Sequence, residues 1–200
     1  MDALRLIKAT RHALAEARTA EDVMVEAWQA CRMAESVAQT AALVLTERAL
    51  EGGGCGPVEI ARALAEAGAH AAECIGRPPD EPVTGERAAR LSELADVGAA
   101  LRELRVLVQE ASESLLVVAC GADEQALYWS CVDGVDAAFQ ARELATELLR
   151  AIGEETGPGP GEGLEPAREG AGLRQAERAA LGPAGRASGR AGIRLDPPPG

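Results

Sequence analysis

The chain has 200 residues, of which 47% are hydrophobic and 26% charged, a composition typical of a globular protein with a core. Its formal net charge is −12, and an acidic surface repels the phosphates of nucleic acids and anionic lipid head groups. We therefore expect neither nucleic acid nor membrane as the main partner.

The first two predicted helices cover residues 2–18 and run from Thr19 to about Leu50, as helical periodicity indicates. Thr19 and Asp22 are spaced as in a variant of the capping box, so the second helix is predicted to begin there. The glycines of EGGGCGP, residues 51–57, end it. Pro57 is tolerated in a first turn and opens a third helix to about Ile75.

The segment GRPPDEPVTG, residues 76–85, is predicted to be a loop because its prolines cannot continue a helix. Thr84 is the expected start signal of a fourth helix over residues 86–119, which Gly121 ends. Asp123 is predicted to cap a fifth helix that extends to about Ile152. The fold class is therefore all-α, an elongated antiparallel bundle of about five helices over residues 1–152.

Residues 153–200 have a different composition, with 12 glycines, 7 prolines and no aromatic residue among 48 positions. Such a segment buries too little apolar surface to offset the entropy of ordering, which predicts a disordered tail. The bundle and the tail are the two expected parts of the chain.

Nothing in the sequence indicates export or a membrane span. The N-terminus lacks a long apolar segment, and the longest apolar run, residues 115–120, is far shorter than the roughly 20 residues of a span. The five cysteines have no CxxC spacing, which favours reduced thiols over a disulfide framework or a zinc ribbon. We expect a cytoplasmic protein.

Three of the four aromatic residues lie in LYWSCVDGVDAAF, residues 127–139. On a helical wheel Tyr128, Val132, Val135 and Phe139 fall within about 60° of arc, with Cys131 beside them. This pattern predicts an apolar stripe of α-helix that packs in the core.

Trp129 lies away from that stripe, next to Asp133 and Asp136 at the edge of the polar face. Tryptophan is frequent among the residues that dominate binding energy, so we predict an interaction patch of Trp129, Asp133 and Asp136. The alternative is a boundary residue whose ring packs against a neighbouring helix.

Two carboxylate pairs, Glu110 with Glu113 and Asp133 with Asp136, have i, i+3 spacing. They loosely resemble the ExxE and ExxD pairs of all-α nucleotide pyrophosphohydrolases, in which Mg²⁺ held between helices activates water. The resemblance implies a Mg²⁺-dependent hydrolase as an alternative. However, the helical wheel points both pairs away from the apolar stripes of their helices, and the first aspartate departs from the family pattern.

Another possible pair of metal ligands is His70 and Cys74, one helical turn apart, with a third ligand from Cys120 or Cys131. A buried free cysteine and a hydrated histidine explain this pair better. We therefore expect no cofactor and no resident metal.

The segments MDALRLIKATRHALAEARTAEDVMVEAWQA and ACGADEQALYWSCVDGVDAA resemble a family of small uncharacterised helical proteins from actinomycete bacteria. This resemblance implies a cytoplasmic protein without an assigned activity, and no functional residues carry over.

The sequence thus favours a non-enzymatic interaction or scaffold module, with a protein partner or self-association. Besides the hydrolase, one further alternative is a regulatory bundle that binds a small ligand in a cavity near Tyr128, Cys131 and Phe139.

Overall fold

The computed structural model describes residues 1–51, 55–78 and 86–153. These residues form five α-helices and one short 3₁₀ helix: α1 (Ala3–Glu16), α2 (Ala20–Leu50), α3 (Gly56–Ile75), η2 (Ala88–Arg90), α4 (Val97–Cys120) and α5 (Gln125–Ala151). The prediction of an all-α bundle of five helices is confirmed. The predicted tail beyond Gly153 and the predicted start signal Thr84 lie outside the described residues.

Several predicted helix ends are confirmed. The Thr19 side chain accepts a hydrogen bond from the Asp22 amide, and the Asp22 carboxylate accepts one from the Thr19 amide, each at 3.1 Å. Pro57 lies in the first turn of α3, and Gly121 is the residue that follows α4. The predicted cap Asp123 is wrong, because the turn after Gly121 extends one residue further and Glu124 precedes α5 without a side-chain capping bond.

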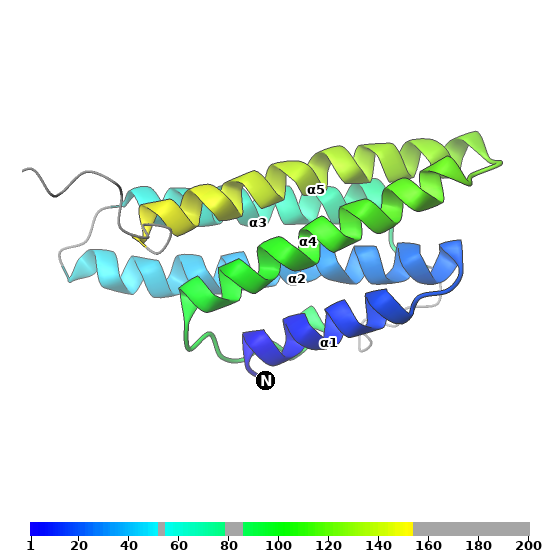
Figure 1. The fold of residues 1–200 in the computed structure, drawn as a ribbon. Helices are drawn as coiled ribbons and strands as arrows, with labels where there is room; N and C mark the ends of the chain where they lie inside the picture. The colour runs from blue at the N-terminus through cyan, green and yellow to red at the C-terminus, as the bar shows by residue number, and fades with distance from the viewer. Residues whose placement is uncertain (52–54, 79–85, 154–200) are drawn as a thin grey trace, which may run out of the picture. The chain divides into compact units, whose positions relative to one another are not determined.

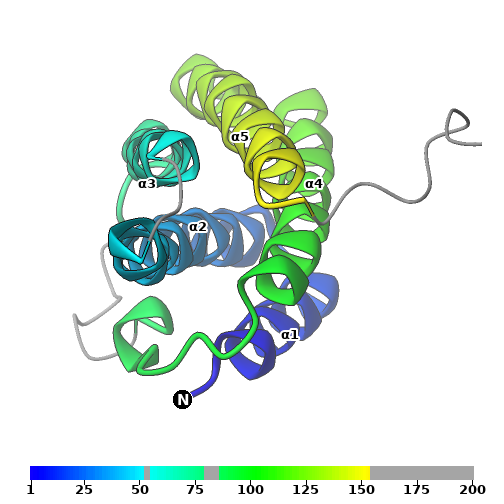
Figure 2. The ribbon, with the colours of Figure 1, turned by 90° about the vertical axis from the view of Figure 1, so that its left-hand side faces the viewer.

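Four of the helices, α2, α3, α5 and α4, form a bundle in which each pair of neighbours runs antiparallel (Figures 1 and 2). Helix α1 packs against both α2 and α4. The core is rich in alanine, with larger side chains such as Met33, Leu104, Leu115 and Leu148 filling its centre. Trp28 is only 6% exposed and belongs to the core. Within the described residues no helix is both long and apolar enough to cross a membrane.

The predicted start of the fourth helix is wrong. Helix α4 begins at Val97, where the Asp96 side chain accepts a hydrogen bond from the Ala99 amide at 2.9 Å. Because α3 and α4 run in the same direction, the chain between them has to return along the bundle before α4 can begin (Figure 1). Residues 86–96, here called the connecting segment, make part of that return.

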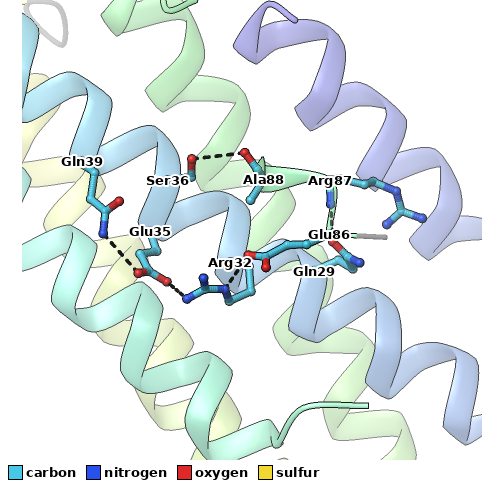
Figure 3. Close-up of polar contacts among 8 residues, drawn as sticks. All are labelled: Gln29, Arg32, Glu35, Ser36, Gln39, Glu86, Arg87 and Ala88. Carbon is cyan, nitrogen blue, oxygen red and sulfur yellow. Dashed lines mark hydrogen bonds and ion pairs between the residues drawn. The ribbon is translucent and has the colours of Figure 1, made fainter. Parts of the chain in front are cut away.

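Polar contacts hold the connecting segment against α2 (Figure 3). Arg32 of α2 donates to Glu86 at 2.6 Å and also pairs with Glu35. The Arg87 amide donates to Oε1 of Gln29, a buried side chain of α2, at 2.9 Å. At its other end the segment meets the N-terminus, where the Ala3 amide donates to the Glu93 carbonyl at 3.1 Å.

Candidate interaction surface on α4 and α5

Small residues, not aromatic ones, form the buried side of α5. Its buried positions are Cys131, Gly134, Ala137, Ala138, Ala141, Ala145, Leu148 and Leu149. A Cβ atom on Gly134 would lie 2.8 Å from Cγ1 of Ile75 in α3, so the two helices leave little room for side chains between them. Close approach of this kind selects glycine and alanine for the core side.

The apolar stripe predicted for the core therefore faces outward. Tyr128 is 41% exposed and Phe139 is 50% exposed, while Val132 and Val135 between them are partly buried. The prediction that Tyr128 and Phe139 pack inside is wrong. The helical spacing groups these residues on one side of α5 correctly. The opposite side, which carries the small residues, is the one that packs against α3 and α4, because small side chains allow a closer approach.

Helix lengths explain why the beginning of α5 is uncovered. Ile75 is the last residue of α3 and lies beside Gly134, so the first turns of α5 extend beyond the end of α3 (Figure 1). Trp129 lies in these turns and is 51% exposed, and its ring meets that of Tyr128 edge to face at a centroid distance of 5.2 Å. The matching turns of α4 expose Leu116 and Val117.

The exposed stripe is bounded at its other end by contacts between the two helices. The Arg142 guanidinium lies 4.2 Å from the centre of the Phe139 ring and donates to the Gln109 side chain of α4. A groove of about 350 Å³ between the helices is lined there by Arg105, Val106, Gln109, Arg142, Glu143 and Thr146. We call the exposed apolar residues Val106, Leu116, Tyr128, Trp129 and Phe139 the α4–α5 surface.

Carboxylates flank this surface. Asp133 and Asp136 are exposed on α5, near Trp129 in the sequence. Burial, followed by the negative charge of Asp133, raises the pKa of the Cys74 thiol on α3. From Arg105 to Glu143 the chain has seven acidic residues and two basic ones, Arg105 and Arg142. The α4–α5 surface is thus apolar along its centre, and the carboxylates around it outnumber the arginines.

The two carboxylate pairs are not assembled into a metal centre. Both oxygens of Glu110 accept hydrogen bonds from Arg11 of α1, at 2.9 and 2.5 Å, and Glu113 accepts one from Gln109 at 2.6 Å. The same arginine also donates to Glu103 at 2.9 Å, and these carboxylates raise the pKa of Arg11. In the part of the chain that the structure describes, no three His, Cys, Asp or Glu side chains lie close enough together to hold a metal ion.

The other predicted sites are also separated. Sγ of Cys74 lies 3.7 Å from Nε2 of His70, whereas the buried Cys131 contacts Sδ of Met24 at 3.6 Å. Cys131 is fully buried while Tyr128 and Phe139 are at the surface, so these three side chains do not line one cavity. The prediction of a ligand cavity there is wrong.

Together these features describe an all-helical protein with an apolar surface, surrounded by more carboxylates than arginines, on a helical hairpin. The chain belongs to a family of unknown function, DUF6099, which it matches over residues 1–151. No curated protein and no solved structure matches the chain. The expectation of an uncharacterised helical family is confirmed.

Proposed function

We propose that this protein is a non-enzymatic interaction module that binds a protein partner through the α4–α5 surface. The observation that carries the proposal is the exposure of three of the four aromatic residues, Tyr128, Trp129 and Phe139, on one helix. Large apolar side chains grouped at a surface are typical of binding sites, and tryptophan and tyrosine are enriched among residues that dominate binding energy. Asp133 and Asp136, the other members of the predicted patch, are exposed on the same helix.

Among the residues that the structure describes, no contact favours the hydrolase, because Glu110 is paired with Arg11 on one helix and Asp133 and Asp136 are exposed on another. The cytoplasmic location, the relation to actinomycete proteins and the disordered tail are further proposals that depend on sequence alone.

Photo-crosslinking tests the interaction directly. A photoreactive amino acid is placed at position 129 in the full chain, expressed in cells of the organism from which the chain comes, and adducts are identified by mass spectrometry. The matched control carries the same amino acid at Leu43, an apolar α2 residue that is 69% exposed. A defined adduct from position 129 but not from position 43 is expected. The same adducts from both positions, or none from 129, contradict the proposal.

Thermal unfolding supplies the second test. Because Trp129 is half exposed, Trp129→Ala is expected to reduce the crosslinked partner's binding while lowering the free energy of unfolding by less than about 1 kcal/mol. A loss of several kcal/mol, typical of buried aromatic truncations at about 3–5 kcal/mol, would assign Trp129 to the core instead.

A further inference from the structure

We infer that the α4–α5 surface binds a cationic amphipathic helix of its protein partner. This inference rests on the proposed function and adds the chemistry of the partner to it. Two independent observations support it: the shape of the exposed apolar stripe and the charge around it.

The stripe has the dimensions of a helix-binding site. Tyr128 and Phe139 are separated by eleven positions on one straight helix, which is roughly 16 Å at 1.5 Å per residue. On α4, Leu116 and Val106 are exposed over a similar length of the antiparallel neighbour. Side chains at i, i+3, i+4 and i+7 of an incoming helix can pack against exposed apolar residues of two neighbouring helices. About three turns of partner helix would cover the stripe.

Charge selects the kind of helix. Five of the six acidic residues between Val106 and Ala141 are exposed: Glu113, Asp123, Glu124, Asp133 and Asp136. The sixth, Glu110, is paired with Arg11 on the side of α4 that faces α1. Arg105 and Arg142 line the groove at one end of the surface, but the five exposed carboxylates outnumber them, so the surface attracts lysines and arginines placed beside the apolar face of a partner helix. The same carboxylates repel nucleic acid and anionic membranes.

Charge also disfavours a second copy of this chain as the occupant. A two-fold contact uses the same surface patch on both subunits. Two copies joined through the α4–α5 surface would therefore bring identical exposed carboxylates toward one another. Like charges placed together across an interface oppose binding.

The intrinsic fluorescence of the full chain allows a direct test. Trp129 is exposed and Trp28 is buried, so a blue shift of the tryptophan emission on binding reports Trp129. The probe is a synthetic helical peptide with leucines at i, i+3, i+4 and i+7 and lysines elsewhere. One control peptide has glutamate in place of every lysine, and another has the lysine and leucine positions scrambled.

The lysine peptide is expected to shift the emission and to bind less tightly as salt is added, whereas both control peptides bind at least tenfold more weakly. Trp129→Ala, followed by calorimetry, should weaken binding of the lysine peptide by about tenfold or more. The double variant Asp133→Asn with Asp136→Asn should weaken it about threefold to tenfold.

A second double variant, matched in net charge, distinguishes nonspecific charge attraction from binding at the site. Glu47→Gln with Glu66→Gln removes two exposed carboxylates from α2 and α3 and changes the net charge equally. Equal losses for the two double variants, or equal binding of the scrambled peptide, would overturn the inference. The inference would also be overturned by a dimer that light scattering detects and that crosslinks through position 129. A crosslinked partner whose contacting segment is acidic would overturn it too. The last result would leave the interaction module itself in place, whereas absence of any adduct at position 129 removes both.

Discussion

Single glycines set how closely the helices approach. A Cβ atom on Gly68 of α3 would lie 2.7 Å from the backbone nitrogen of Glu35 and 3.1 Å from the carbonyl oxygen of Cys31, both in α2. Gly68→Ala is therefore expected to lower the free energy of unfolding in urea by about 1–3 kcal/mol, as overpacking does, because backbone cannot move aside locally.

Gly134→Ala is the matched comparison, since its new methyl group would meet side-chain atoms of Ile75 and Leu115, which can adjust. A gain in helix propensity of roughly 1 kcal/mol offsets part of that cost. Equal destabilisation by the two substitutions would show that backbone contact between α2 and α3 is not the limiting feature.

The fully buried thiol of Cys31 makes stability depend on alkaline pH. Burial raises its pKa from the ordinary 9.0 to about 12, because the core disfavours the thiolate. Between these values the unfolded chain loses a proton that the folded protein keeps, so the stabilisation is complete below pH 9 and is lost as the pH rises toward 12.

Urea unfolding at a series of alkaline pH values should show this loss, at up to about 1.4 kcal/mol per pH unit for one proton. Cys31→Ala should have a shallower decline than the unmodified chain. Identical slopes for the two proteins would mean that Cys31 does not titrate differently in the two states.

At the scale of the element, helical periodicity and end signals predicted most of the fold. Thr19 with Asp22, Pro57 and Gly121 mark helix ends by local chemistry, which a sequence displays directly. The beginning of α4 depends instead on the parallel arrangement of α3 and α4, which is a tertiary feature. The apolar spacing before Val97 therefore resembles that of a helix although no α-helix forms there.

In the candidate site, too, local spacing can be read from the sequence whereas tertiary packing cannot. Periodicity grouped Tyr128 with Phe139 correctly, and it set Trp129 apart beside Asp133 and Asp136. It could not show that the alanine and glycine side of α5 is buried, because that depends on the close approach of α3 at Gly134. It also could not show that α3 ends level with Gly134 and leaves the first turns of α5 uncovered.

One of the contacts that attach the connecting segment uses a buried acceptor on α2, Gln29. Gln29→Met keeps the approximate volume of the side chain but removes Oε1, which accepts the hydrogen bond from the Arg87 amide. We expect the amides of residues 87–91 to exchange with solvent at least tenfold faster, since a buried hydrogen bond contributes about 0.5–1.5 kcal/mol and its loss leaves a donor unpaired.

Hydrogen exchange followed by mass spectrometry measures this change, with peptides from the middle of α5 as the internal reference. Faster exchange throughout the protein would indicate that Gln29 stabilises the whole bundle. Unchanged exchange at residues 87–91 would show that Arg32 with Glu86 and Arg87 with Glu26 hold the segment without it.

At the scale of the whole molecule, the core and the α4–α5 surface both belong to residues 1–153, which the family match also nearly covers. The composition of residues 154–200, rich in glycine and proline and without aromatic residues, predicts that they add little to the stability of the bundle. A chain ending at Gly153 is therefore expected to unfold cooperatively, with a melting temperature within about 2 °C of the full chain, since a shift of that size corresponds to about 0.5–1 kcal/mol for a domain of this length. Circular dichroism at 222 nm during heating makes the comparison, and the lysine peptide should bind both chains equally, because its site lies wholly within the shorter one. A markedly lower melting temperature for the shorter chain would mean that the fold extends beyond the five helices.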